Sequence, residues 1–150
     1  MPDFLLLHGP DLNLLGTQGS ELSAATCLED IEANCIDTAE ELGHRLDCCQ
    51  SNAEHKLIER IQKAGKNKVA FIIINPGAFT HTSVALRDAL LVVDIPFIEI
   101  HLSNIFAGEQ HRHKSYFSDI AKACLFGFGA FGYELAIHAA DRYISKAEEH

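Results

Sequence analysis

Short apolar runs alternate with longer amphipathic segments along this chain. Apolar runs of about four to eight residues are typical of buried strands, whereas apolar positions that recur every three or four residues indicate helices. On this basis we expect strands at residues 4–8, 45–50, 69–75, 97–101 and 123–126. We expect helices at residues 28–42, 54–64, 83–93 and 133–146. Strands and helices therefore alternate from one end of the sequence to the other.

Residues at the ends of the expected helices fit these bounds. Thr26 can cap the first helix, because Glu29 follows three positions later and the two side chains can satisfy the first free N–H groups. Gly43 suits the position just after that helix, where the backbone turns left-handed. Gly65 is expected to close the second helix, and Ser83 to cap the third.

Alternating strands and helices indicate repeated βαβ units, and hence an α/β fold with a mostly parallel sheet covered on both faces. With five strands, the flavodoxin-like sandwich with strand order 2-1-3-4-5 is the expected architecture. No repeat, low-complexity tract or Pro/Gly-rich linker divides the 150 residues. We therefore expect one domain over residues 1–150.

The composition argues against two classes of partner. The chain has 12 Lys and Arg against 21 Asp and Glu, a formal charge of −9, whereas nucleic acids are bound through clustered cations. No apolar run approaches the roughly 20 residues of a membrane helix, and no signal peptide is recognisable at Met1. The five cysteines lack a Cys-x-x-Cys spacing and are interpreted as cytoplasmic thiols, three or four of them in the core.

Polar residues collect directly after the expected strands, in segments 8–13, 50–52, 75–83 and 99–104. Ligands of open α/β sheets bind beyond this edge. His8, His81 and His101 all fall there. Glu99 and His101 alternate along one strand, so they share a face and can pair; that pairing would raise the histidine pKa and suit it to donate a proton near neutral pH. A purely structural Glu-His pair is the alternative.

Two further motifs favour plain structural readings. Gly127, Gly129 and Gly132 fit the G-x-G-x-x-G pattern, but the chain ends too soon afterwards for a strand with an acidic ribose ligand, so close packing of a helix on the sheet is expected. His111 and His113 are two residues apart without an obvious third ligand, so we expect a polar loop and no metal site.

Seven strings of residues carry a pattern that covers nearly the whole chain. They are Gly9-Pro10, Leu12-Asn13-Leu14-Leu15-Gly16, Gln50-Ser51-Asn52, Ile73-Ile74-Asn75-Pro76-Gly77-Ala78, Thr80-His81-Thr82-Ser83-Val84-Ala85-Leu86-Arg87-Asp88-Ala89, Glu99-Ile100-His101-Leu102-Ser103-Asn104 and Gly127-Phe128-Gly129-Ala130. Together they resemble the type II 3-dehydroquinate dehydratase family. The resemblance implies a flavodoxin-like subunit in a dodecamer built from trimers, with no cofactor or metal.

The resemblance also implies a reaction, the loss of water from 3-dehydroquinate through an enolate to give 3-dehydroshikimate. This hydro-lyase step belongs to the shikimate pathway of aromatic amino acid biosynthesis or to quinate catabolism. Carried over by position, His101 would be the general acid for the leaving hydroxyl, oriented by Glu99. The substrate would be held by Asn75, His81, Arg112, Leu102 and Ser103, and by Asp88 from a neighbouring subunit.

The loop that should carry the catalytic base departs from the family pattern. Ser23 stands at the position of the catalytic tyrosine and Gln18 at that of its activating arginine, while Asp11 replaces an asparagine and Gly108 another arginine. These changes make the lid three charge units more negative than the pattern. A serine hydroxyl is a far weaker acid than a tyrosine phenol, whose pKa is about 10.

Three readings follow from this mixture. The first is a dehydratase whose base is supplied by Asp11, provided burial raises its pKa, or by Tyr116. The second is an impaired homologue that binds the substrate or regulates active subunits. A flavin-binding electron carrier is weaker, because the loop of residues 8–13 lacks the hydroxyl groups that would hold a flavin phosphate.

Overall fold

A five-stranded sheet forms the centre of the molecule. The computed structural model describes residues 3–16, 27–110 and 114–148. The strands are β1 (Asp3–His8), β2 (Arg45–Gln50), β3 (Phe71–Asn75), β4 (Phe97–His101) and β5 (Ala123–Phe126). They lie in the order β2-β1-β3-β4-β5, and every neighbouring pair is parallel. The predicted flavodoxin-like order is therefore confirmed.

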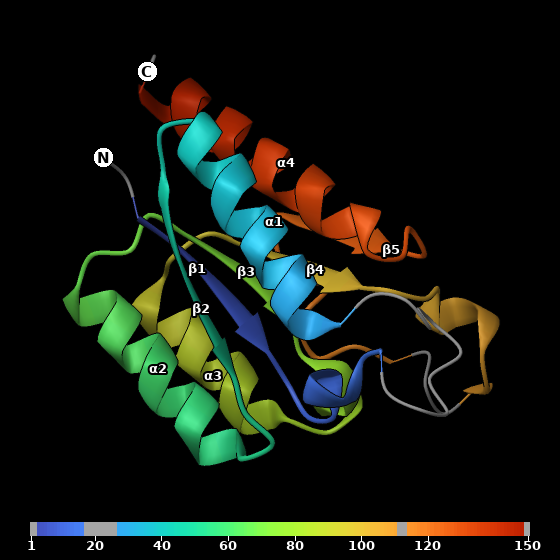
Figure 1. Ribbon diagram of the computed structural model, residues 1–150. Helices are drawn as coiled ribbons and strands as arrows, with labels where there is room; N and C mark the ends of the chain where they lie inside the picture. The colour runs from blue at the N-terminus through green and yellow to red at the C-terminus, as the bar shows by residue number, and fades with distance from the viewer. Residues whose placement is uncertain (1–2, 17–26, 111–113, 149–150) are drawn as a thin grey trace.

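Two pairs of helices cover the two faces of the sheet (Figure 1). On one face lie α1 (Leu28–Glu41) and α4 (Phe131–Glu148), and on the other lie α2 (Glu54–Lys66) and α3 (Val84–Val93). Each pair closes its own apolar core against the strands. Because both faces are covered, β3 is buried at all five of its residues, whereas the edge strand β5 exposes Ala123 and Cys124.

The alternation of side chains along the strands divides the polar residues of the rim between the two faces. The residues two positions before His8 and Asn75 belong to the core beneath α1 and α4, so these two side chains face that side. Phe97 belongs to the core beneath α2 and α3. Glu99 and His101 share its face of the strand, so they lie on the side of the sheet opposite to His8 and Asn75. The functional edge of the sheet is thus built from both faces.

The first helix begins at the predicted Leu28 and is followed by the predicted glycine turn, but its N-cap residue differs from the prediction. Gly43 has a φ of 86°, and its N–H donates to the carbonyl of Glu40 at 3.0 Å, while the N–H of His44 reaches the carbonyl of Ala39 at 2.9 Å. These two bonds satisfy the last carbonyls of the helix. At the other end, the residue in the N-cap position is Cys27, whose side chain accepts no backbone N–H of the helix and instead donates to Asp30 at 3.2 Å. The expected cap, Thr26, lies outside the described residues.

The second helix runs past the glycine that was expected to close it. Gly65 lies within α2, where an added Cβ would come within 3.1 Å of Val93 on α3, so this glycine serves close helix packing. The left-handed residue that follows the helix is Lys68, with a φ of 55°. The same turn shifts the start of β3, predicted at residue 69, to Phe71.

The caps and packing of the last two helices fit the sequence well. The Oγ of Ser83 accepts the N–H of Leu86 at 3.0 Å, which confirms the predicted cap of α3. The Ser83 hydroxyl also donates to Glu54 at 2.6 Å. Helix α4 starts at Phe131, slightly earlier than predicted, and a Cβ on Gly132 would come within 3.3 Å of the Ile100 side chain. The glycine motif therefore serves close packing of α4 on β4.

The cysteines are less buried than predicted. All five thiols are free, but only Cys35 is fully buried, while Cys48 and Cys49 are half-buried at the edges of the two cores. Side chains of β2 are covered on each face by one helix, but β2 is an edge strand, so its residues keep contact with solvent.

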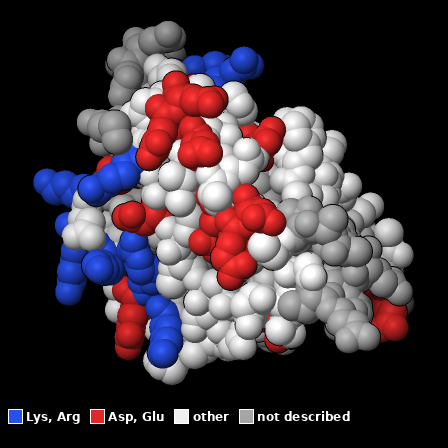
Figure 2. All heavy atoms as spheres, viewed as in Figure 1, with Lys and Arg blue, Asp and Glu red and all other residues white. Residues whose placement is uncertain are grey.

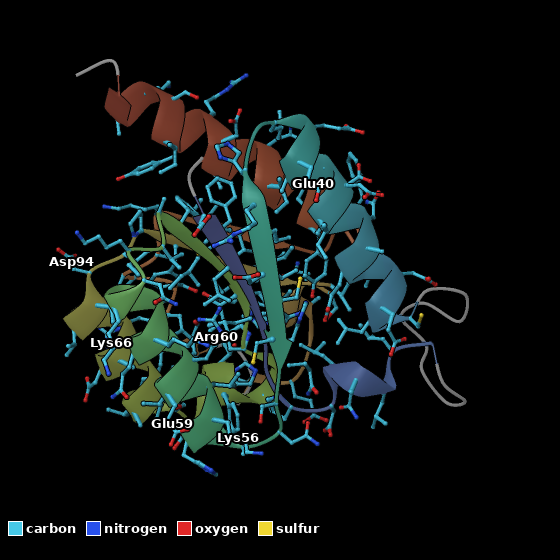
Figure 3. The ribbon with its side chains drawn as sticks, turned by 60° about the vertical axis from the view of Figure 1, so that its left-hand side comes forward. Glu40, Lys56, Glu59, Arg60, Lys66 and Asp94 are labelled. Carbon is cyan, nitrogen blue, oxygen red and sulfur yellow. The ribbon has the colours of Figure 1, made fainter. Side chains whose placement is uncertain are left out.

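Charge is distributed unevenly over the surface. Helix α1 carries six acidic residues and no Lys or Arg, whereas α2 carries Lys56, Arg60, Lys63 and Lys66. Figure 2 shows the acidic side chains gathered over α1 and the basic ones on the side of α2. In Figure 3, Arg60 lies between α2 and the sheet, where its Nη2 is 3.8 Å from Asp47. Within the described residues, no helix is long and apolar enough to cross a membrane.

Candidate active site

A buried carboxylate and imidazole pair lies at the end of β4. The Nε2 of His101 is 2.8 Å from Oε2 of Glu99 and 3.2 Å from Oγ1 of Thr80. Glu99 and Thr80 are fully buried, and His101 is 6% exposed. A ring nitrogen that faces a carboxylate carries the hydrogen, so Nδ1 is the atom at which His101 can give or take a proton. The predicted pairing of Glu99 with His101 is confirmed.

Two serines that the sequence did not single out complete the surroundings of Glu99. The Ser115 hydroxyl lies 3.0 and 2.9 Å from the two carboxylate oxygens, and the Ser118 hydroxyl lies 2.5 Å from Oε1. An ionised carboxylate only accepts hydrogen bonds, and the partners of Glu99 can all donate. No local signal marks these serines, because they reach Glu99 from 16 and 19 positions away in the chain.

A cleft of about 190 Å³ opens beyond the ends of β3 and β4. Five of the predicted site residues line it, together with four apolar or small neighbours. The lining residues are Asn75, His81, His101, Leu102, Ser103, Leu12, Gly77, Ala78 and Ile105. Segments that are far apart in the sequence therefore bring a proton donor, an amide, a second imidazole and a hydroxyl to one small space, which suits a polar ligand of modest size.

The amide of Asn75 is held in a fixed orientation. Its Nδ2 donates to the hydroxyl of Tyr133 at 2.9 Å, and its Oδ1 accepts the N–H of Gly77 at 3.1 Å. Burial raises the pKa of Tyr133, so its phenol stays neutral. Each end of the amide thus has one bond within the protein and can offer a second to a ligand.

The ring of His81 is oriented by the backbone. Its Nδ1 lies 2.7 Å from the carbonyl oxygen of Lys114. A carbonyl can only accept, so Nδ1 carries the hydrogen and the neutral ring presents Nε2 as an acceptor. In that form His81 can accept a hydrogen bond from a ligand hydroxyl in the cleft.

His8, predicted to belong to this polar rim, is not part of the cleft. It is fully buried on the side of α1 and α4, and neither ring nitrogen has a hydrogen-bond partner. Burial lowers its pKa to about 4, so the ring is neutral near pH 7 and its 3.5 Å approach to Glu32 is not an ion pair there. The alternation of side chains along a strand shows which face of the sheet His8 lies on, but not what covers that face. At His8 the face is covered by Tyr133, whose ring centroid lies 5.5 Å from that of the imidazole.

The two candidates for a replacement base are placed unfavourably. Asp11 is exposed with a φ of 67°, so the burial on which its role depended is absent from the subunit. Its N–H donates to Oδ1 of Asn52 at 3.0 Å, an oxygen that also accepts from Gln50. Tyr116 packs against the core beneath α2 and α3 and is not among the residues that line the cleft.

Two amides of the polar rim, Asn52 and Asn104, serve local structure. Asn52 orders the loop that contains Asp11. Oδ1 of Asn104 accepts the N–H of Phe106 at 3.0 Å and caps the short helix Ile105–Ala107. Both side chains are therefore committed to turns, as Asn often is after a strand.

Comparison with known proteins identifies the family. The model of the family described as Dehydroquinase class II matches residues 2–141 of the chain. The chain belongs to the class II dehydroquinases. It is 59% identical over 140 residues to a 3-dehydroquinate dehydratase of Hahella chejuensis, which covers 93% of this chain and 95% of that protein. A 3-dehydroquinate dehydratase of Xanthomonas oryzae pv. oryzae is 58% identical over 139 residues, covering 93% of this chain and 94% of that one.

Solved dehydroquinase structures agree with this assignment. The fold matches a type II dehydroquinase from Propionibacterium acnes with a TM-score of 0.89 and 33% identity, over 95% of this chain and 97% of that one. A 3-dehydroquinate dehydratase-like protein from Bifidobacterium longum has a TM-score of 0.71 at 24% identity over 97% of this chain and 99% of that one, and so shares the fold. The resemblance of the sequence to this family is therefore confirmed, and the enzyme is favoured over the binding or regulatory homologue.

Several dehydroquinase positions named from the sequence are not among the described residues that line the cleft. Gln18, Ser23 and Arg112, with His111 and His113, lie outside the described residues. Asp88 is exposed on α3 and lines a groove between α2 and α3. Among the residues that the structure describes, no group of three or more His, Cys, Asp or Glu side chains is arranged to hold a metal ion.

Proposed function

We propose that this dehydroquinase converts 3-dehydroquinate into 3-dehydroshikimate, in the shikimate pathway or in quinate catabolism. The observation that carries the proposal is the buried Glu99 and His101 pair, whose imidazole lines the cleft beside Asn75, His81 and Ser103. The named relatives at 58 and 59% identity support the same reaction. The small volume of the cleft, about 190 Å³, suits a compact polyhydroxy acid.

The elimination needs a base at the carbon next to the ketone and an acid at the leaving hydroxyl. His101 is proposed as the acid, giving its Nδ1 proton to the hydroxyl that departs as water while the electron pair of the enolate forms the new double bond. Glu99 holds Nε2 at 2.8 Å, which orients the ring and stabilises it when it carries both protons. A positioned acid of this kind typically contributes about 10² to 10⁴ in rate.

Substrate binding is proposed to draw on both faces of the sheet. Asn75 and His81 would bind substrate hydroxyls, supported by the fixed orientations of the amide and the ring. Arg112 would add a cation, and Leu102 and Ser103 would take the carboxylate at the end of β4. The enzyme would then bind an anion through local groups in spite of its net charge of −9.

The base is the weak part of the proposed mechanism. Ser23 and Gln18 stand where the family pattern has a tyrosine and an arginine, and Gly108 and Asp11 remove further positive charge. A serine hydroxyl without an adjacent cation remains protonated near pH 7, so proton removal from carbon should be slow. We therefore expect a turnover number lower by about 10² to 10⁴ than that of a dehydroquinase with the complete lid.

Assembly into a dodecamer of trimers is part of the proposal. Helix α3 carries three exposed apolar side chains, Val84, Leu91 and Val92, with exposures of 50, 50 and 83%. Such a surface favours contact with another subunit. Asp88 on the same helix would then reach the neighbouring site. The five free thiols support a reducing, cytoplasmic setting.

A turnover assay that follows the enone of 3-dehydroshikimate tests the proposal. We expect slow formation of the product by the wild type and none above background by His101→Asn. Calorimetry with 3-dehydroquinate should show binding that weakens in Arg112→Ala. Binding without any turnover would favour the regulatory homologue, and equal binding by Arg112→Ala would show that Arg112 lies outside the pocket.

A further inference from the structure

Residues 114–119, just before β5, hold both histidines of the cleft in place. The carbonyl of Lys114 accepts from Nδ1 of His81 at 2.7 Å. The next residue but one, Tyr116, donates its N–H to the carbonyl of Thr80 at 2.9 Å. Ser115 and Ser118 donate to Glu99. This segment therefore contacts Glu99, which orients the proposed acid, and also orients His81, a proposed binding residue.

The segment is itself anchored from outside the cleft. Arg87 of α3 forms a two-pronged ion pair with Asp119, with its Nη1 2.5 Å from Oδ1 and its Nη2 2.9 Å from Oδ2. Nη1 also donates to the carbonyl of Tyr116 at 2.8 Å. The Arg87 guanidinium lowers the pKa of Asp119, so this pair stays ionised. Loss of one serine hydroxyl should leave the path of the segment intact.

Glu99 needs these hydroxyls because it is a carboxylate with no contact to solvent. A buried charge is costly unless hydrogen bonds replace its water. His101 donates to Oε2, Ser118 donates to Oε1, and Ser115 lies within bonding distance of both oxygens, between which it can share its one hydrogen. Cys124 of β5 also faces this oxygen, at 3.9 Å from Sγ. The serines thus help to stabilise the negative charge of Glu99, which the imidazole would otherwise have to stabilise alone.

We propose that Ser115 and Ser118 are positioning residues for the dehydration, which fix the Glu99 carboxylate and share its charge so that His101 is both oriented and free to release its proton. The proposal rests on the function proposed above. With the serines in place, the carboxylate holds Nε2 without stabilising the doubly protonated ring so strongly that the Nδ1 proton is retained.

Ser118 is the residue to test, because its described bond goes to Glu99, whereas the Ser115 oxygen also accepts the N–H groups of Phe117 and Ser118. In Ser118→Ala we expect kcat to fall about tenfold with KM within about twofold, since one bond to a charged group is lost away from the substrate. Ser118→Thr restores a hydroxyl and should keep kcat close to the wild-type value.

Ser83→Ala is the matched control. Ser83 also donates to a carboxylate, that of Glu54 at 2.6 Å, and it caps α3, so its loss lowers the melting temperature without touching Glu99. Equal falls in kcat for Ser118→Ala and Ser83→Ala would overturn the proposal, as would an effect of Ser118→Ala confined to KM.

A spectroscopic measurement separates this proposal from the proposed function. The proton on Nε2 of His101 should give a downfield NMR signal, assigned by its loss in His101→Asn. We expect this signal to move further downfield in Ser118→Ala, because Glu99 then has fewer donors, and to stay unchanged in Ser83→Ala. An unmoved signal in Ser118→Ala would overturn the role of Ser118. A moved signal in a protein without turnover would count against the dehydration alone.

Discussion

Strands β1 and β4 end at the same rim of the sheet, and each places a titratable side chain in the interior there. Glu99 of β4 is surrounded by hydroxyl and imidazole donors, whereas neither ring nitrogen of His8 on β1 has a hydrogen-bond partner. Both side chains have no exposed surface. The difference shows that burial does not mark a functional group; the partners decide whether a buried group keeps a charge or stays neutral.

Strands β1 and β4 also differ in the segments that follow them. Beyond β4, Leu102 and Ser103 continue into a cleft wall beside the proposed acid. Beyond β1, the loop presents an exposed Asp11 and leads toward the positions where Ser23 and Gln18 depart from the family pattern. In the proposed mechanism, the described residues thus supply the acid, whereas the substitutions fall in the half that would remove a proton from carbon.

The largest effect should follow from removal of the acid. We expect His101→Asn to lower kcat by about 10² to 10⁴, because it removes the ring that delivers the proton. The assay is product formation at saturating substrate. His138→Asn, an exposed histidine on α4, is the control and should keep the wild-type rate. A rate for His101→Asn within about twofold of the control would show that the β4 end does not supply the acid.

His8 should have its main effect on stability in acid. Burial lowers its pKa in the folded protein from 6.5 to about 4. The unfolded chain therefore takes up a proton near pH 6.5 while the folded protein does not, so stability is fully present above pH 6.5 and falls as the pH drops toward 4. The total loss from this group is about 3 kcal/mol.

Urea unfolding at pH 7.0, 5.5 and 4.0 measures this loss. His8→Leu should flatten the dependence on pH across the window, since an apolar side chain of similar volume has no proton to take up. His138→Leu should leave the slope unchanged, because His138 is exposed. An equally steep slope in His8→Leu would show that His8 is solvated in the folded protein.

The altered half of the site can be restored by substitution. The triple variant Asp11→Asn, Gln18→Arg, Ser23→Tyr returns the family's residues, and we expect its turnover to rise by about tenfold or more. His101→Asn in that background should abolish the gain, since the base cannot act without the acid. A triple variant no faster than the wild type would direct attention to Gly108, the remaining lost arginine.

The sequence predicted the order of elements well and their ends less well. Buried strands such as β3 are apolar throughout, and Ser83 caps α3 through a local bond, so both leave a signal over a few residues. The prediction that Gly65 ends α2 was wrong, because a glycine can either end a helix or let two helices approach closely. Only the contact with Val93 shows that Gly65 serves close packing. Lys68 takes the left-handed turn instead.

The same limit applies to the site. Glu99 and His101 were predictable because two residues on one strand share a face. Ser115 and Ser118 reach Glu99 across a long loop, and Tyr133 bonds to Asn75 from 58 positions away. No local sequence pattern predicts these contacts. His8 follows the same strand rule as Glu99, yet the rule cannot say that α1 and α4 close over it.

The smallest expected effect concerns the charge of Asp11 alone. An exposed carboxylate beside the cleft should weaken binding of the anionic substrate, and Asp11→Asn should tighten the Kd of 3-dehydroquinate by up to about fivefold at low salt, since exposed charges about 4 Å apart interact by about 1 kcal/mol. Asp94→Asn is a close control, because Asp94 is also exposed and left-handed, with a φ of 54°. Asp94 precedes β4 and so lies at the amino-terminal ends of the strands, away from the cleft (Figure 3). Calorimetry at low and high salt should show the gain only for Asp11→Asn and only at low salt, because salt screens exposed charges. An equal gain for both variants would assign the effect to net charge and leave the β1 end without a specific part in binding.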